Sequence, residues 1–242
     1  MDILKAYICI SLSKEVYLNP DDRHISGEES FSDKGSGTEG FSLVDGDTQY
    51  ISFRGTEKRY KDWKTDFSFW KTRRHYGRVH KGFCDAYESI RPLLIPPPCK
   101  KVVFTGHSLG GAIAQIAALE WSVFYPNAEI EVYTFGAPKI FAYKAHKRYN
   151  EKVKKSFHFV LNNDIIPRIP TINYWGTSSL YYINKDGEIV TNSKRSYRIK
   201  DGLRDFKIDG KVEFFSDHNQ EDYYRYIKDN LNEQEIKRAA KK

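Results

Sequence analysis

The chain has 242 residues, 40% of them hydrophobic, which is enough to bury one substantial core and predicts a single domain. No apolar run approaches the roughly 20 residues that cross a bilayer, and the mean hydropathy of −0.64 argues against a membrane protein. Three cysteines, Cys9, Cys84 and Cys99, are too few and too irregularly spaced for a disulfide framework or a metal site, which favours a reducing compartment.

Residues 1–46 are expected to form an N-terminal helix followed by a variable acidic loop. The apolar patch after Met1 has neither a basic leader nor a small-residue cleavage site, so it is a poor signal peptide. The expected location is therefore intracellular, in the cytoplasm or at the periphery of membranes. The glycine-rich stretch 33–40 is read as a loop or a partly disordered arm.

Residues 47–226 carry the alternation expected of a catalytic core. Strands rich in β-branched or aromatic residues are predicted at 49–53, 101–105, 129–135 and 156–161, and a helix at 109–124. Strands that alternate with helices favour a mostly parallel sheet with helices on its faces. A hairpin around Asp186-Gly187 is predicted at 180–190. A last helix begins near residue 222, and residues 227–242 form a charged tail.

The most informative motif is Gly106-His107-Ser108-Leu109-Gly110, which fits the G-x-S-x-G nucleophile elbow. It follows a predicted strand and precedes an alanine-rich helix, which is the context the motif requires. The flanking glycines remove the Cβ atoms that would collide in so sharp a turn. A glycine-rich turn without chemistry is the alternative interpretation of these five residues alone.

A serine nucleophile needs a histidine base and a carboxylate to orient that base. In chain order the carboxylate and then the histidine follow the serine in this class of fold. Asp164 stands at the end of a predicted strand, and His218 lies in Ser216-Asp217-His218. These positions predict the triad Ser108, Asp164 and His218, with His146 as an alternative base.

Four separated blocks resemble the class 3 lipase family, the fungal-lipase-like branch of the α/β-hydrolases. They are Ile51-Ser52-Phe53-Arg54-Gly55-Thr56, Val79-His80-Lys81-Gly82-Phe83, the elbow at 103–111 together with Tyr133-Thr134-Phe135-Gly136-Ala137-Pro138, and Asn162-Asn163-Asp164-Ile165-Ile166-Pro167-Arg168-Ile169-Pro170. The resemblance runs from about residue 47 to 226. It implies an α/β-hydrolase fold with a lid over the active site, and hydrolysis of lipid esters through an acyl-enzyme on Ser108 without a cofactor.

By this resemblance, the backbone N–H groups of Thr56 and Leu109 form the oxyanion hole. The lid would follow Thr56 and include Tyr60, Trp63 and Phe67, an apolar stripe at helical spacing that ordinary packing would also explain. Asp66 occupies the position that hydrogen-bonds the oxyanion residue in the family. His80 is expected to support the site, and His107 to point away from the nucleophile.

The net charge of +7 is concentrated between Glu57 and Lys81, where nine basic residues accompany three acidic ones. A solvated face is the simplest explanation. Because this cluster coincides with the expected lid, an anionic membrane surface is a sharper hypothesis for the partner. An acyltransferase or a catalytically silent lipid-binding module on the same scaffold remains an alternative. Charge alone would suggest nucleic acid, but the sequence lacks a nucleic-acid-binding motif, so no such partner is expected.

Overall fold

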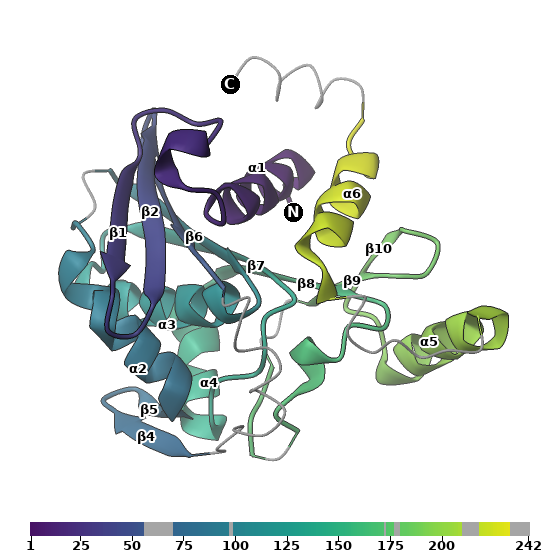
Figure 1. The fold of residues 1–242 in the computed structure, drawn as a ribbon. Helices are drawn as coiled ribbons and strands as arrows, with labels where there is room; N and C mark the ends of the chain where they lie inside the picture. Colours follow the sequence, from purple (N-terminus) through teal and green to yellow (C-terminus); the bar gives the residue numbers. More distant parts are fainter. Residues whose placement is uncertain (56–69, 97–98, 172, 177–179, 210–217, 233–242) are drawn as a thin grey trace.

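The structure is a computed structural model that describes residues 1–55, 70–96, 99–171, 173–176, 180–209 and 218–232. Its centre is a twisted sheet with helices on both faces (Figure 1). No helix in these described ranges is both long and apolar enough to cross a membrane. The expected α/β-hydrolase architecture, a mostly parallel sheet flanked by helices, is confirmed.

The sheet has eight strands in the order β1-β2-β3-β6-β7-β8-β9-β10. From β3 to β9 neighbouring strands are parallel, while β1, β2 and β10 pair antiparallel at the two edges. The strands are β1 Glu29–Asp33, β2 Thr38–Asp45, β3 Thr48–Phe53, β6 Lys101–His107, β7 Glu129–Phe135, β8 Lys155–Leu161, β9 Leu180–Ile183 and β10 Ile189–Thr191. The four predicted core strands and the β9–β10 hairpin are therefore present.

The sheet is covered by helices α1 Ile3–Glu15 and α6 Gln220–Asp229 on one face and by α2 Lys81–Ile90, α3 Leu109–Phe124 and α4 Tyr143–Lys152 on the other (Figure 1). The central strands are buried on both faces. In β6, for example, Val102 and Phe104 pack in the core beneath α3, whereas Val103 packs in the core beneath α1. Burial on two faces explains why these strands appear as continuous apolar runs.

One expectation for the N-terminal region was wrong. The segment expected to be an acidic loop contains β1 and β2, a hairpin that extends the main sheet, with Asp33 opposite Thr38 at its turn. Edge strands tolerate charged and polar side chains because one face is open to solvent, so the acidic composition concealed the pairing. The expected first helix is present as α1, and the tail beyond residue 232 lies outside the described residues.

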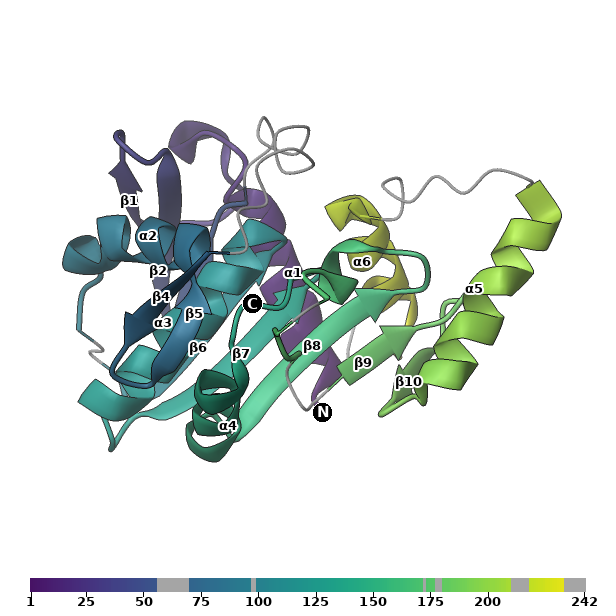
Figure 2. The same ribbon diagram turned by 90° about the horizontal axis from the view of Figure 1, so that it is seen from below.

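Two further elements, a hairpin at residues 71–80 and a helix at residues 195–209, were not predicted from the sequence. Strands β4 Lys71–Arg74 and β5 Gly77–His80 form a separate two-stranded sheet beside α4. Helix α5 Arg195–Asp209 follows β10 and lies beside β9 and β10 at the sheet edge (Figure 2).

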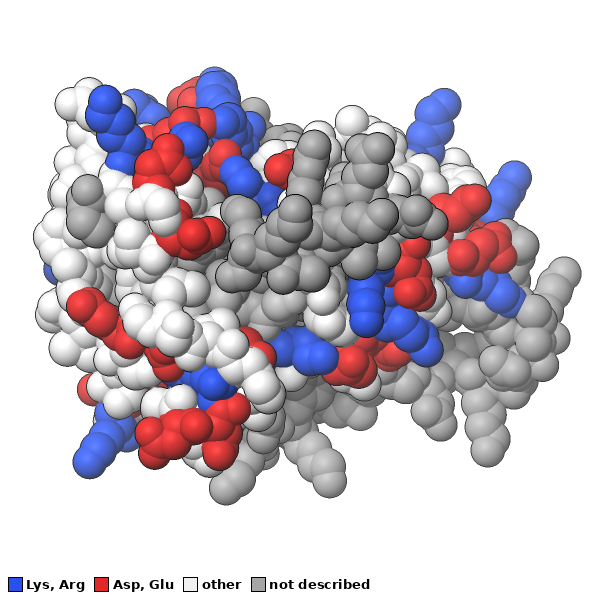
Figure 3. Space-filling view, turned by 90° about the horizontal axis from the view of Figure 1, so that it is seen from above, with Lys and Arg blue, Asp and Glu red and all other residues white. Residues whose placement is uncertain are grey.

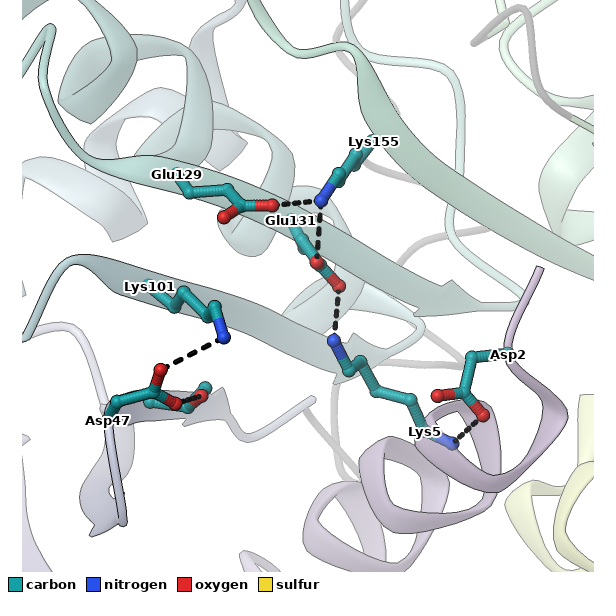
Figure 4. A network of polar contacts seen from close by, with 8 residues as sticks. Asp2, Lys5, Asp47, Lys101, Glu129, Glu131 and Lys155 are labelled. Carbon is teal, nitrogen blue, oxygen red and sulfur yellow. Dashed lines mark hydrogen bonds and ion pairs between the residues drawn. The ribbon is translucent and has the colours of Figure 1, made fainter.

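The amino ends of the parallel strands are joined by ion pairs (Figure 4). Lys155 contacts both Glu129 and Glu131, and Glu131 also accepts from Lys5 of α1 at 3.0 Å. Lys101 lies 2.9 Å from Asp47. These contacts join the amino ends of β3, β6, β7 and β8 to one another and to α1. The functional sites of α/β sheets lie at the opposite end, where the strands have their carboxyl ends.

Candidate active site

Ser108 sits in the sharp turn between β6 and α3. Its backbone has φ 56° and ψ −122°, a region that non-glycine residues rarely adopt. The turn is held by the Ser108 N–H, which donates to the Phe135 carbonyl at 2.9 Å. A Cβ on Gly110 would lie only 2.0 Å from the Phe53 carbonyl oxygen. The glycine therefore allows α3 to approach β3 closely, and the strained serine is held at the end of the strand.

The surroundings of Ser108 suit a developing negative charge. Ser108 is 6% exposed and immediately precedes α3, a helix of sixteen residues whose N-terminal amides carry partial positive charge. Leu109 is the first helical residue, so its N–H has no acceptor within the helix. The end of β3 passes beside the serine, since a Cβ on Gly55 would lie 3.6 Å from Ser108 Cβ. Thr56, the other expected oxyanion donor, lies outside the described residues.

Asp164 and His218 meet across 54 residues of chain. Asp164 follows β8 and is fully buried. Its Oδ2 lies 2.8 Å from His218 Nδ1, and since a carboxylate only accepts, the histidine donates from Nδ1. The other oxygen, Oδ1, accepts from the Ile166 N–H at 2.9 Å. This arrangement leaves Nε2 as the nitrogen that can take a proton, as a triad base requires.

Tyr223 is a third donor to Asp164, and the sequence reading missed it. Its hydroxyl donates to Asp164 Oδ2 at 2.6 Å and accepts from the Leu161 N–H at 3.0 Å. It lies on the buried face of α6 with Ile227, four residues further on. That spacing is visible in the sequence and predicts burial, but it does not reveal which group the hydroxyl contacts.

His107 packs directly against the ring of His218, with the ring centroids 4.6 Å apart. The sequence predicts a structural residue that points away from the nucleophile. In the structure its ring packs against His218 and Tyr223. Burial, and secondarily the electrostatic influence of the adjacent His218, lower the pKa of His107 well below its usual value. His107 is therefore a neutral ring that fixes one face of His218.

Gly136 gives His218 and Asp164 the space they occupy. It follows β7 with φ 62°, and a Cβ at this position would lie 2.8 Å from Asp164 Oδ2 and 2.9 Å from His218 Cε1. A side chain would therefore push the pair apart. The Gly136-Ala137-Pro138 block supplies this close approach.

The remaining histidines are placed elsewhere. His146 on α4 lies 3.0 Å from the Asn150 amide through Nε2, so the geometry favours His218 over His146 as the base. His80 packs between Phe83 and Tyr174, and burial lowers its pKa to about 4. His158 is bonded to the Thr134 hydroxyl at 2.6 Å. The described residues contain no cluster of three or more metal-binding side chains.

The expected lid residues Tyr60, Trp63, Asp66 and Phe67 also lie outside the described residues. The structure therefore brings together Asp164 and His218, places Ser108 in its elbow and Leu109 at the helix start, and leaves the lid assignment as a prediction.

The sequence model of the family described as Lipase (class 3) matches residues 50–174. This chain belongs to the class 3 lipase family. A lipase of Rhizopus niveus is 31% identical over 183 residues, an alignment that covers 67% of this chain and 44% of that protein. A secreted mono- and diacylglycerol lipase of Fusarium solani is 25% identical and covered to 51%. The chain thus spans about half the length of the curated relatives it matches.

Solved structures of lipases share the fold of this chain. The mono- and diacylglycerol lipase of Aspergillus oryzae matches with a TM-score of 0.72 at 22% identity, over 91% of this chain and 95% of that one. The triacylglyceride lipase of Rhizomucor miehei matches with a TM-score of 0.68 at 22% identity, over 78% of this chain and 82% of that one.

Proposed function

We propose that this class 3 lipase is a serine carboxylic-ester hydrolase that acts on lipids, with Ser108 as nucleophile, His218 as base and Asp164 as the residue that orients the base. The observation that carries the proposal is the buried Asp164–His218 hydrogen bond at the same sheet edge as the strained Ser108 turn. The relatives described as triacylglycerol lipases and as mono- and diacylglycerol lipases support a glyceride ester as substrate class.

In the proposed reaction, Ser108 Oγ attacks the ester carbonyl while His218 Nε2 takes its proton. The oxygen that gains the negative charge accepts from the Leu109 N–H, and we assign the second donor to Thr56. His218 then protonates the leaving alcohol, and a water molecule activated by the same histidine releases the fatty acid from Ser108. Asp164 keeps the proton of His218 on Nδ1 throughout. Loss of one oxyanion donor typically slows such a reaction by about 10²- to 10³-fold.

The proposal is tested with purified protein on short-chain nitrophenyl esters and then on triglyceride, diacylglycerol and phospholipid dispersions. We expect turnover by the wild type, a loss of at least about 10³-fold in Ser108→Ala and His218→Ala, and little change in His146→Ala. Folded wild-type protein without turnover on any ester would instead support the silent lipid-binding alternative. An added alcohol distinguishes the acyltransferase alternative, which predicts more transesterified product than free acid.

A second part of the proposal concerns the part of the protein surface that would contact a lipid membrane or droplet. Arg73 and Arg78 are exposed and directly opposite each other on β4 and β5, and neither pairs with an acid among the described residues. Like charges placed opposite each other are unfavourable unless an anion lies nearby. By contrast, Arg74 and Lys81 already contact carboxylates. On the opposite face of the molecule, seen in Figure 3, the basic and acidic side chains of the described residues are interspersed.

We therefore propose that the β4–β5 hairpin faces an anionic lipid surface. The double variant Arg73→Glu, Arg78→Glu should bind vesicles containing anionic lipid several-fold more weakly than wild type, with ester turnover on a water-soluble substrate unchanged. The control Lys228→Glu reverses an exposed charge on α6, which covers the opposite face of the main sheet. Equal binding by all three proteins would contradict an anionic surface.

The domain organisation and the cellular setting remain part of the proposal. We propose one catalytic domain in which residues 1–46 complete the sheet edge. Cys9 and Cys84 lie in separate core clusters, and all three cysteines are free thiols, which supports the proposed intracellular location.

A further inference from the structure

A cavity of about 700 Å³ lies at the sheet edge between β8, β9, α5 and the segment 165–176. This volume is within the range of small-molecule binding sites. Figure 2 shows α5 at the side of β9 and β10, well separated from α4 along the sheet. The cavity is formed by other residues than the elbow and the triad, since neither Ser108 nor His218 lines it.

Four cationic side chains from three separate chain segments line this cavity. They are Lys139 after β7, Arg168 after β8, and Arg195 and Arg198 on α5. Among the described residues, no acidic side chain is part of the lining. None of the four forms an ion pair with a carboxylate in the described ranges. Arg168 donates to the Asn162 carbonyl at 2.6 Å, and Arg198 contacts the Ser193 carbonyl, so their described partners are neutral.

The nearby carboxylate of Asp201 is turned to other partners. Its Oδ2 accepts from the Tyr182 hydroxyl at 2.9 Å and from the Lys185 N–H at 3.1 Å. Burial, followed by the charges of Arg195 and Arg198, lowers the pKa of the half-buried Lys139. In addition, Arg195 and Arg198 stand in the first turn of α5, where the helix itself carries partial positive charge and disfavours cations. The free protein therefore bears an unfavourable positive cluster that an anion would relieve.

Beside the cations and the polar side chains of His158, Thr171 and Tyr182, the lining has an apolar wall that includes Val160, Ile165, Pro167, Leu180 and Ile199. A free inorganic ion would use only the cations, whereas an amphiphile would use both surfaces. Guanidinium groups bind phosphate through paired hydrogen bonds, and several cations suit a group with two negative charges better than a carboxylate with one. We propose that this cavity binds a phosphate monoester joined to a single acyl chain, with the phosphate on the four cations and the chain on the apolar wall. This site goes beyond the proposed hydrolysis and does not require it.

The test measures binding by calorimetry in the Ser108→Ala background, so that turnover cannot consume a ligand. The probes are a monoacylglycerol phosphate, the matching monoacylglycerol, oleate and inorganic phosphate, each below its aggregation concentration. We expect the monoacylglycerol phosphate to bind most tightly. The additional substitutions Arg195→Gln and Arg198→Gln should weaken its binding by about 10- to 100-fold, and rising salt should weaken it further.

Lys200→Gln is the matched control, because Lys200 lies on α5 but does not line the cavity. Thermal unfolding of each variant checks that the fold is retained. Equal binding by the double variant and the control would overturn the site. If oleate or the monoacylglycerol binds as tightly as the monoacylglycerol phosphate, the proposed role of the phosphate group is wrong. If inorganic phosphate binds as tightly, the proposed role of the acyl chain is wrong. Because Ser108 is absent from all these proteins, failure here would leave the esterase proposal untouched, and an inactive wild-type enzyme would leave this site standing.

Discussion

At the scale of single residues, Tyr223 supports Asp164 of the proposed triad through a single hydroxyl group. Tyr223→Phe deletes one of the hydrogen bonds to Asp164 and leaves the buried Leu161 N–H without its acceptor. We expect kcat/KM on a soluble ester to fall about 10-fold, because Asp164 is held less firmly, and the free energy of unfolding to fall by about 1–3 kcal/mol. Ester kinetics and urea unfolding measure both effects.

Tyr224→Phe is the control for this prediction. It removes a neighbouring hydroxyl of α6 that bonds to Tyr7 at 2.8 Å, away from Asp164. If the two variants lose activity equally, the Tyr223 hydroxyl does not position the carboxylate.

The sequence predicts the role of a residue that lies in a local motif. It does not predict the role of a residue that acts through contacts with distant parts of the chain. Ser108 follows from its glycine-flanked turn, and the order of Asp164 and His218 follows from the fold class. The packing of the His107 ring on His218 could not be predicted, because the position of His218 depends on how α6 meets the ends of the strands. The need for glycine at Gly136 likewise could not be predicted, because it arises from the close approach of the Asp164 and His218 side chains.

At the scale of elements, the β4–β5 hairpin is joined to α2 and α3 through Arg74. Its guanidinium contacts Glu88 and lies 3.0 Å from Glu120, whose side chain is only 1% exposed. Arg91 reaches the same Glu120 carboxylate at 3.8 Å. Arg74→Met would leave a buried carboxylate with the longer contact alone, so we expect the free energy of unfolding to fall by about 3–5 kcal/mol.

Urea unfolding measures this loss. Arg73→Met removes the exposed neighbouring arginine, which has no acidic partner in the described part of the chain, and should change stability by less than about 0.5 kcal/mol. In Arg74→Met, the second change Glu120→Gln should restore part of the stability, because the unpaired charge is then gone. No restoration would show that packing, rather than the ion pair, holds the hairpin.

The same contrast between local and distant contacts governs the elements. Helix α3 begins and ends where the sequence predicts, because its apolar composition and the proline after it are local signals. The β1–β2 hairpin was missed because edge strands carry polar residues, and α2 was missed because its four buried residues are mixed with charges. Tertiary packing, rather than intrinsic propensity, decides such segments.

At the scale of the whole molecule, alternating strands and helices were sufficient to predict the sheet class but not the order of its edges. The parallel core follows from the alternation and the β9–β10 hairpin from its Asp-Gly turn, whereas β1 and β2 join by antiparallel pairing that composition does not fix. The buried histidines are similarly a property of the assembled core. His80, His107 and His158 are 5–6% exposed and belong to three different strands, β5, β6 and β8.

These three histidines make the stability of the whole protein depend on pH. Burial lowers the pKa of His80 and His158 to about 4 and that of His107 well below its usual value. In the unfolded chain all three would titrate near 6.5, so the unfolded state binds more protons below that pH. The free energy of unfolding is therefore not reduced by these histidines above about pH 6.5. As the pH falls toward 4, it decreases by up to about 1.4 kcal/mol per pH unit for each histidine.

His158→Asn tests this dependence, because an amide can keep the hydrogen bond to Thr134 without titrating. Between pH 6.5 and 4.5 the free energy of unfolding should fall less steeply in this variant, by up to about 1.4 kcal/mol per pH unit. His75→Asn, at an exposed position without an ion pair among the described residues, should keep the slope of the wild type. Urea unfolding at a series of pH values measures the slopes. If His158→Asn and wild type have the same slope, His158 takes up a proton without unfolding, and the acid sensitivity must come from His80, His107 or the carboxylates.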